Sequence, residues 1–291
     1  MPPVIYDMLN LSKLPLNAGL GLKPEHYDDA LACSKDGLWF EIHPENYMVA
    51  GGPRLAWLQA FCDKFPMSFH GVGLSLGGID RPDKEHLKRL KYLIDRFSPA
   101  QVSEHFAWSK HDNIYFADLL PPPINEESLN RIVAHIEETQ EYLGRTILIE
   151  NPSLYLPVTG FEELPHIYVE AAKRSGAGLL FDLNNIAVCA ANVDLPYQNW
   201  LDVVPGDMVG EVHLAGSSSR TIKQEVVLID SHDAPVSELV WQIFEKFIHK
   251  NGVKPVLIER DDNIPTFDEL LAERDHAEDL MREFSQEAAD V

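Results

Sequence analysis

Hydrophobic and polar positions follow two repeating patterns along this chain. Eight short, mostly apolar runs recur, and the segments between them repeat their apolar positions every three to four residues. The runs are 16–22, 38–43, 66–74, 101–108, 145–151, 176–185, 210–216 and 254–260. This pattern predicts eight β-strands joined by amphipathic helices, among them helices over 83–97, 125–143, 161–175 and 235–250.

The order of these elements indicates the fold class. A strand followed by a helix, eight times over, is typical of parallel βα units, and apolar residues on both faces suit strands that are covered on both sides. An open doubly wound sheet is the alternative, but no GxGxxG follows the first run. We therefore predict a single α/β domain over residues 1–291, a (β/α)8 TIM barrel, ending in an acidic helix and tail over about 266–291.

Composition limits the classes of function. The 24 Lys and Arg residues against 46 Asp and Glu residues give a net charge of −22, which opposes binding to nucleic acid. No apolar stretch is long enough for a membrane helix, and the N-terminus lacks the features of a signal peptide. Cys33, Cys62 and Cys189 are too scattered for a disulfide framework or a CxxC metal site. We expect a cytoplasmic protein.

Polar side chains that can bind metals end every predicted strand from the second onward. They are Glu41 and His43, His70, Glu104 and His105, Glu150 and Asn151, then Asp182, Asn184 and Asn185, Glu211 and His213, and Glu259. The carboxyl ends of barrel strands meet at one face, and side chains two residues apart share a side of the strand. Charged groups gathered in such a mouth must be paired or must coordinate a cation. The sequence therefore predicts a cluster of metal ions.

Several of these candidate ligands, and a loop after the seventh strand, have more than one interpretation. By itself, the loop DSHD with Asp230 and His232 is typical of a turn or surface loop. Beside the other candidate ligands, we expect it to close on a metal from outside the barrel. The strand-end residues also have interpretations without a metal: His70 as a core histidine, Glu150 as part of an ion pair, and Asn151 and Asn184 as turn residues. We expect Glu41, His43, Asn46, Asn151, Asn184 and Glu211 to support the ligands or to position substrate. The glycines of HGVGLSLGG (70–78) lack P-loop spacing and indicate close backbone packing beside the site.

These motifs resemble a known family. HGVGLSLGG, SEHFAW, IENPSLYL, FDLNNI, EVHLAG, DSHD and LIERDDNIP occur in the order found in the multinuclear non-haem iron-dependent oxidases, formerly a domain of unknown function. The family includes the iron enzyme of methanobactin biosynthesis, and the resemblance extends from about Gly19 to Pro265. It implies a xylose-isomerase-like TIM barrel with two or three iron ions, mixed Fe(II) and Fe(III), that uses O2 to modify cysteines of a ribosomally synthesised precursor peptide. It also implies a partner protein that presents this peptide.

The resemblance also implies a set of ligands. His70, His105 and Glu150 would hold a first metal, and Glu150 would bridge to a second one held by Asp182, His213 and Glu259. Asn185, Asp230 and His232 would hold a third, and no catalytic residue beyond the metal ligands is expected. Nucleases of the same superfamily have a histidine in place of Asn185. Ligation by imidazole, carboxylate and amide groups favours iron or manganese, although zinc remains an alternative.

Three other functions compete with the oxidase. A zinc- or manganese-dependent phosphodiesterase of the endonuclease type is opposed by the charge of −22 and by Asn185. A sugar isomerase usually needs a lysine near the end of the fifth or sixth strand, and neither predicted strand has one. A metal-storage or interaction protein would bind metal without consuming O2.

Overall fold

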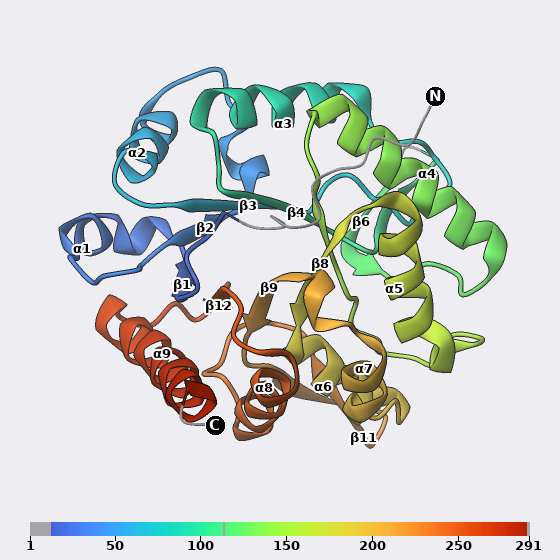
Figure 1. Ribbon diagram of the computed structural model, residues 1–291. Helices are drawn as coiled ribbons and strands as arrows, with labels where there is room; N and C mark the ends of the chain where they lie inside the picture. Colours follow the sequence, from blue (N-terminus) through green and yellow to red (C-terminus); the bar gives the residue numbers. More distant parts are fainter. Residues whose placement is uncertain (1–12, 113, 290–291) are drawn as a thin grey trace.

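Eight parallel strands form a closed barrel in a computed structural model, which describes residues 13–112 and 114–289 (Figure 1). Neighbouring strands around the barrel follow the order β1-β12-β9-β8-β7-β4-β3-β2. Their bounds are β1 Ala18–Gly21, β2 Phe40–Ile42, β3 Met67–Gly71, β4 Gln101–His105, β7 Leu148–Glu150, β8 Gly178–Asp182, β9 Val209–Leu214 and β12 Val256–Ile258. The prediction of eight strands in a (β/α)8 barrel is confirmed.

Helices surround this barrel on the outside (Figure 1). The α-helices are α1 Tyr27–Ala32, α2 Pro53–Cys62, α3 Lys84–Phe97, α4 Glu126–Leu143, α5 Leu164–Ser175, α6 Leu183–Val193, α7 Tyr197–Val203, α8 Glu238–Asn251 and α9 Phe267–Ala289. Short 3-10 turns are η2 Pro24–His26, η3 Pro44–Tyr47, η4 Phe161–Glu163 and η5 Gly206–Met208. All four helices named from the sequence are present, although the first turn of 161–175 is η4 and the last helix begins at Glu238.

Local sequence explains where several helices begin and end. Side-chain oxygens of Asp83, Asn125 and Ser237 accept hydrogen bonds from backbone N–H groups in the first turns of α3, α4 and α8. Gly144 and Gly176 end α4 and α5 in the left-handed conformation, which glycine adopts without steric strain. These capping groups satisfy backbone atoms that have no partner within the helix.

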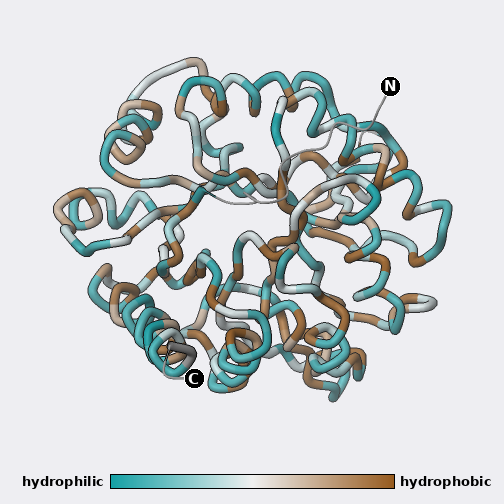
Figure 2. Tube along the Cα trace, in the orientation of Figure 1, coloured by the Kyte–Doolittle hydropathy of each residue, from teal (hydrophilic) through white to brown (hydrophobic). Residues whose placement is uncertain are grey.

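Two kinds of packing surround and fill the barrel. The outer helices turn an apolar stripe inward, as α3 does with Leu87, Leu90 and Leu93, and Figure 2 shows hydrophilic and hydrophobic positions recurring along these helices. Inside the barrel, Leu14, Trp39 and Leu257 form a separate buried cluster. Leu14 and Trp39 come just before β1 and β2, so this cluster closes the N-terminal end of the barrel. The metal-capable side chains lie at the opposite end of the barrel, where the strands have their carboxyl ends.

Two β-hairpins were not predicted. β5 (Trp108–His111) pairs with β6 (Ile114–Leu120) after β4, and β10 (Ser218–Ile222) pairs with β11 (Glu225–Ile229) after β9. Both hairpins follow the carboxyl end of a barrel strand, so they belong to the loops on that face of the barrel.

All eight strands are shorter than the runs predicted for them, and two of these runs extend into another element. The run 101–108 stops at His105 in β4, and Trp108 already belongs to hairpin strand β5. The run 176–185 stops at Asp182, because the Asp182 side chain accepts a hydrogen bond from the backbone N–H of Asn185 and starts helix α6 there.

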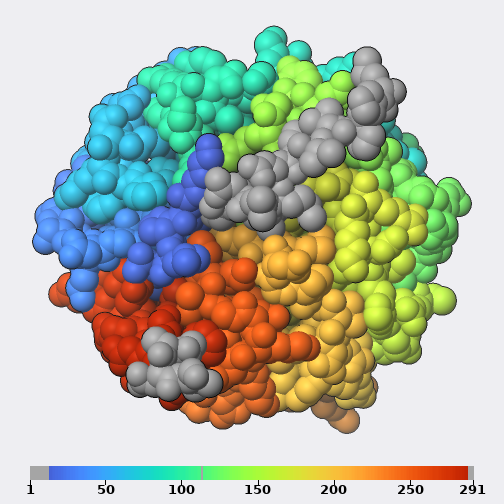
Figure 3. Space-filling model, viewed as in Figure 1, coloured from blue at the N-terminus to red at the C-terminus, as the bar shows by residue number. Residues whose placement is uncertain are grey.

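The two ends of the barrel sequence meet where the barrel closes. β1 pairs with β12, and Figure 3 shows the first segments of the barrel in blue beside the last ones in orange and red. Helix α9 covers this seam, where the buried Arg274 side chain donates a hydrogen bond to the carbonyl of Ala18 (2.8 Å). Residues 1–12, which are part of the N-terminal segment expected to lack a signal peptide, and residues 290–291 of the predicted tail lie outside the described residues. None of the helices in the described ranges combines the length and apolar character needed to cross a membrane.

Substitution of Gly19 by alanine tests the packing at the barrel's N-terminal end. A Cβ atom at this position would overlap the Trp39 ring, which is fully buried. We expect Gly19→Ala to lower the free energy of unfolding by about 1–3 kcal/mol, measured by urea denaturation. Gly51→Ala is the control, because no atom lies within 4 Å of a Cβ built there. Equal stability of the two variants would contradict this account of the packing.

Candidate metal centre

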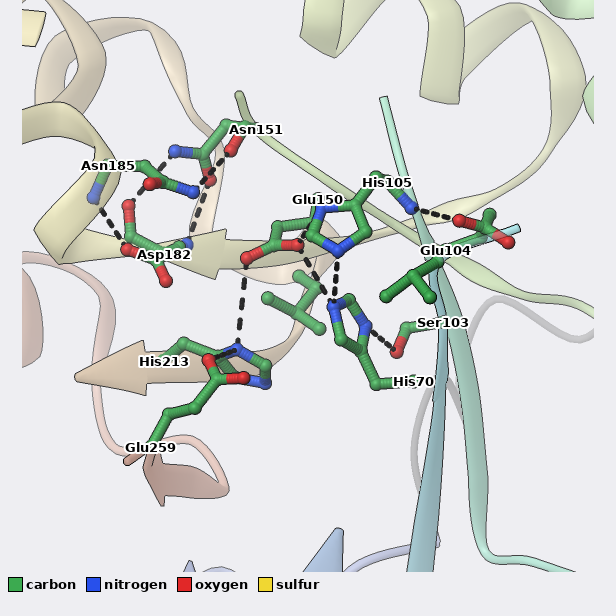
Figure 4. A network of polar contacts seen from close by, with 12 residues as sticks. His70, Ser103, Glu104, His105, Glu150, Asn151, Asp182, Asn185, His213 and Glu259 are labelled. Atoms are coloured by element: carbon green, nitrogen blue, oxygen red, sulfur yellow. Dashed lines mark hydrogen bonds and ion pairs between the residues drawn. The ribbon is translucent and has the colours of Figure 1, made fainter. Parts of the chain in front are cut away.

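The Glu150 side chain lies at the centre of the polar end of the barrel (Figure 4). Glu150 ends β7, where it pairs in register with His105 of β4. Its Oε2 atom is 2.6 Å from His105 Nδ1 and 3.1 Å from His70 Nε2, whereas its Oε1 atom is 3.8 Å from His213 Nδ1. One carboxylate therefore faces a histidine pair with one oxygen and a third histidine with the other.

His70 and His105 form the first group with Glu150. Their rings meet edge to face, with 3.0 Å between the two Nε2 atoms. His70 Nδ1 is hydrogen-bonded to the Ser103 hydroxyl (2.8 Å), which fixes the orientation of the ring. The ligand atoms of His70, His105 and Glu150 all lie within 4.8 Å of one another, so the three residues could hold a metal ion.

His213 is the hub of a second group. Its Nδ1 atom is 3.1 Å from Glu259 Oε2, and its Nε2 atom is 3.4 Å from Glu41 Oε1 and 3.5 Å from Glu211 Oε1. Two sets of residues here have the spacing to hold an ion: Glu150, Asp182 and His213, and Glu41, His213 and Glu259. Glu41 and Glu211 also accept hydrogen bonds from the Ser68 hydroxyl, at 2.8 and 3.2 Å.

The loop DSHD reaches the same region, as expected for a loop that closes on the centre. His232 Nδ1 is 3.3 Å from Glu259 Oε2, and Asp182, His232 and Glu259 form a further set with metal-binding spacing. His232 Nε2 is 2.8 Å from Asp230 Oδ1. Asn184 donates a hydrogen bond to the same Asp230 oxygen (2.7 Å), which holds the loop against the first turn of α6.

Asn151 and Asn185 hold the ends of β7 and β8 together. The Asn151 side chain accepts a hydrogen bond from the Asp182 backbone N–H (2.8 Å) and donates one to the Asp182 carbonyl (2.9 Å). The Asn185 amide group donates to the Asn151 carbonyl (3.0 Å), and its Oδ1 atom is buried without a hydrogen-bond partner. The Asn185 oxygen is therefore available as a ligand, whereas Asn151 positions the backbone around Asp182.

The buried carboxylates influence one another strongly. Burial raises the pKa of a carboxyl group, but His105 and His70 outweigh that effect at Glu150 and hold its pKa well below the usual value. Burial and the neighbouring charges of Glu150 and Asp230 raise the pKa of Asp182 well above its ordinary value. Burial and Glu41 raise the pKa of Glu211 to about 8. A cation close to Asp182 would remove this opposition to its charge.

The donor atoms fit a metal centre. Among the described residues, Asp182 Oδ2, Asn185 Oδ1 and both ring nitrogens of His213 are buried without hydrogen-bond partners, and such groups are unfavourable unless a cation or water meets them. Burial would lower the pKa of His213, but Glu41 and Glu259 raise it well above its ordinary value, so a bound metal would displace a proton there. Within the described ranges, no cysteine belongs to any group with metal-binding spacing.

One residue at the centre was missed by the sequence analysis. Asp261 Oδ2 is 3.4 Å from His232 Nδ1, and its Oδ1 atom is 3.7 Å from His43 Nε2 and 2.6 Å from Lys23 Nζ. His43, Glu259 and Asp261 also have metal-binding spacing. Asp261 follows Glu259 by two residues, and this period-2 spacing could have identified it.

The predicted supporting residues of the second strand lie along a cavity beside the centre. His43 contacts the His70 carbonyl through Nδ1 (3.2 Å), and Asn46 lies in the short turn η3. Both line a cavity of about 410 Å³ that is also bordered by Glu41 and Glu259. Lys23, Tyr27, Tyr47 and Arg54 complete most of its wall. The cavity thus borders two carboxylates of the centre.

Comparison with known sequences gives a consistent family. Residues 17–282 match the profile of a family described as "RiPP precursor modification enzyme MbnB/TglH/ChrH". A UPF0276 protein of Caulobacter sp. (strain K31) is 51% identical over 265 residues, which cover 91% of this chain and 96% of that protein. A UPF0276 protein of Bordetella bronchiseptica is 46% identical over 271 residues, covering 90% of this chain and 91% of that protein.

Solved structures show the fold. D-psicose 3-epimerase from Clostridium cellulolyticum H10 superposes with a TM-score of 0.58 at 10% identity, covering 92% of this chain and 99% of that one. A xylose isomerase-like TIM barrel protein from Mycobacterium smegmatis, in complex with magnesium, gives 0.53 at 13% identity and 84% of each chain. Endonuclease IV from Thermus thermophilus gives 0.55 at 15% identity, covering 93% of this chain and 99% of that one. The xylose-isomerase-like barrel is confirmed, and these identities say nothing further about activity.

Divalent metal should stabilise the metal-free protein. A ligand present at 100 times its Kd and bound only by the folded state adds about 2.7 kcal/mol to the free energy of unfolding. We expect Co2+ to stabilise the wild type in urea denaturation by this amount and to stabilise Glu150→Gln less, because Glu150 belongs to two groups. Glu137→Gln, at an exposed position of α4, is the control. A wild-type protein that is unaffected by Co2+, Zn2+ and Fe2+ would contradict the presence of a metal centre.

Proposed function

Because this chain belongs to the MbnB/TglH/ChrH family of RiPP precursor modification enzymes, we propose that it is a multinuclear iron enzyme that uses O2 to oxidise cysteines of a ribosomally synthesised precursor peptide. The observation that supports this proposal most directly is the position of Glu150. Its two oxygens face His70 and His105 on one side and His213 on the other, as a carboxylate bridging two ions would. We infer a centre of two or three ions.

We assign the ligands as follows. His70, His105 and Glu150 would hold the first ion, and Glu150, Asp182, His213 and Glu259 the second. Asn185, Asp230 and His232 would hold the third. Asp182 and Glu259 also lie within ligand distance of His232, so the third ion would share carboxylates with the second. Imidazole, carboxylate and amide donors without thiolate suit iron or manganese.

The side chains of this chain would prepare the centre for reaction. Bound iron would supply activation of O2 and an anchor for the thiolate of the substrate cysteine. The Ser103 hydroxyl is hydrogen-bonded to Nδ1 of His70, so the Nε2 atom faces His105 and Glu150 and would bind the metal. Glu41 and Glu211 face His213 Nε2, which leaves Nδ1 directed toward Glu150 and Glu259. With the Leu14–Trp39–Leu257 cluster closing the opposite end, access to the centre would be from the side of the loops.

The cavity beside the centre offers space for the substrate. Its volume of about 410 Å³ lies in the range of small-ligand sites, and it is bordered by Glu41 and Glu259 of the centre. We infer that it receives the peptide residues next to the reacting cysteine, with His43 and Asn46 contacting them. A partner protein that presents the peptide would approach the same face. The net charge of −22 does not suit a nucleic-acid substrate.

Iron content and O2 consumption test the proposed activity. We expect two or three irons per chain after anaerobic purification, seen by metal analysis and Mössbauer spectroscopy, and O2 uptake that depends on a cysteine-bearing precursor peptide. His105→Ala and Glu150→Ala should lose iron and activity together, because both residues belong to the first group. His111→Ala, on the exposed side of hairpin strand β5, should retain both. Stoichiometric zinc after iron-replete growth, with no iron signal, would overturn the oxidase and favour a hydrolase.

Blocking the cavity should separate substrate binding from metal binding. Asn46 is exposed and lines the cavity, and it is not among the ligands assigned above, so Asn46→Trp should fill space without removing a ligand. We expect a KM for the precursor peptide that is raised about 10-fold or more, with unchanged iron content. A variant with wild-type KM would place the substrate elsewhere, and a variant that loses iron would assign Asn46 to the centre.

A further inference from the structure

Two carboxylates, the buried Glu104 and the half-buried Glu45, hold the segment directly after His70. Resting on the proposed metal centre, we propose that Glu45 and Glu104 position His70 and His105 by clamping the backbone of residues 71–74. Four backbone N–H groups, those of Val72, Gly73, Leu74 and His105, donate to these two side chains. Neither carboxylate belongs to a group with metal-binding spacing.

Glu104 uses both of its oxygens. It lies in β4 between Ser103 and His105, so its side chain leaves the strand on the side opposite to theirs. Its Oε1 atom accepts from the backbone N–H of His105 (2.9 Å), and its Oε2 atom accepts from that of Leu74 (3.1 Å). One side chain therefore ties the strand end that bears His105 to the segment that follows His70.

Glu45 uses a single oxygen. Its Oε1 atom accepts from the backbone N–H groups of Val72 (3.0 Å) and Gly73 (3.1 Å), and His86 Nε2 of α3 lies 3.2 Å from the same oxygen. Glu45 Oε2 is buried without a hydrogen-bond partner. The contacts from η3 thus depend on one acceptor atom and not on the whole carboxylate.

The glycines of the HGVG motif are explained by this close approach. A Cβ atom on Gly71 would lie 2.8 Å from Glu104 Oε2. A Cβ atom on Gly73 would overlap the His86 ring and would lie 3.2 Å from Glu45 Oε1. The sequence pattern indicated tight backbone packing beside the site, and the two carboxylates are the groups that require it.

The clamp has a direct consequence for the first metal group. His70 is one residue before the clamped segment, and its Nε2 atom must stay 3.0 Å from that of His105 and 3.1 Å from Glu150 Oε2. Without the clamp, the end of β3 could shift relative to β4 and separate these donors. Loss of groups that orient metal ligands commonly weakens metal affinity about 10- to 100-fold.

Anaerobic titration of the metal-free protein with Co2+, followed by visible absorption, tests the clamp. Glu104→Gln has one acceptor oxygen where two are needed, and Glu45→Ala has none. We expect each substitution to lower the affinity for one Co2+ ion about 10- to 100-fold and to leave the affinity for the other ions as in wild type. Glu45→Gln keeps one acceptor and should bind like wild type. Glu137→Gln, exposed on α4, is the matched surface control.

The possible results distinguish a positioning role of Glu45 and Glu104 from a general loss of stability and from the absence of a metal centre. Wild-type affinity in both Glu104→Gln and Glu45→Ala would overturn the clamp while leaving the proposed function intact. An equal loss of affinity for every ion would also overturn it, because the clamp acts on one site only. So would an affinity of Glu45→Gln as low as that of Glu45→Ala, because Gln keeps the acceptor oxygen that the backbone hydrogen bonds need. If Glu104→Gln does not fold, Gly73→Ala serves instead and should weaken the same single ion. A wild-type protein that binds no Co2+ would overturn both proposals.

Discussion

Buried charge is concentrated at one end of the barrel and must be compensated there. Glu41, Glu150, Asp182, Glu211 and Glu259 are buried there together with His70 and His213. Isolated charges are strongly unfavourable in such surroundings, and the raised pKa values of Asp182 and Glu211 show that histidines alone do not compensate for the carboxylates. Divalent ions between these groups would bind the buried oxygens that have no hydrogen-bond partner and would balance the excess negative charge.

The barrel register is what brings these groups together. Glu150 lies opposite His105 in the β4–β7 pair, and Asp182 lies opposite His213 in the β8–β9 pair. Closure of the barrel then places Glu259, the residue directly after β12, next to the same His213. Six barrel strands, β2, β3, β4, β7, β8 and β9, supply one or two of these side chains each. The pairing of these strands, rather than any local motif, sets the distances between the side chains.

Loops and helix ends complete the centre and set its surroundings. The first turn of α6 ties the loop DSHD to the barrel through Asn184 and Asp230, while Glu45 and Glu104 hold the segment after β3. The cavity along η3 and β2 gives the centre a side on which a substrate can bind. Metal ligands on rigid strands and substrate contacts on loops are the usual division of roles in this barrel architecture.

The eight strands and the barrel were predictable from the sequence alone, because the apolar runs and the helical periodicity are local properties of the chain. It also placed metal-capable residues at the strand ends, since that follows from the alternation of side chains. Which of these residues meet depends on the three-dimensional packing of the strands and loops. This packing places Glu150 between two groups, Asn151 against the Asp182 backbone, and Asp261 beside His43 and His232. The hairpins over 108–120 and 218–229 and the partners of the glycines after His70 were likewise not predictable. These features depend on contacts between residues far apart in the chain, and a periodic pattern carries no information about such distances.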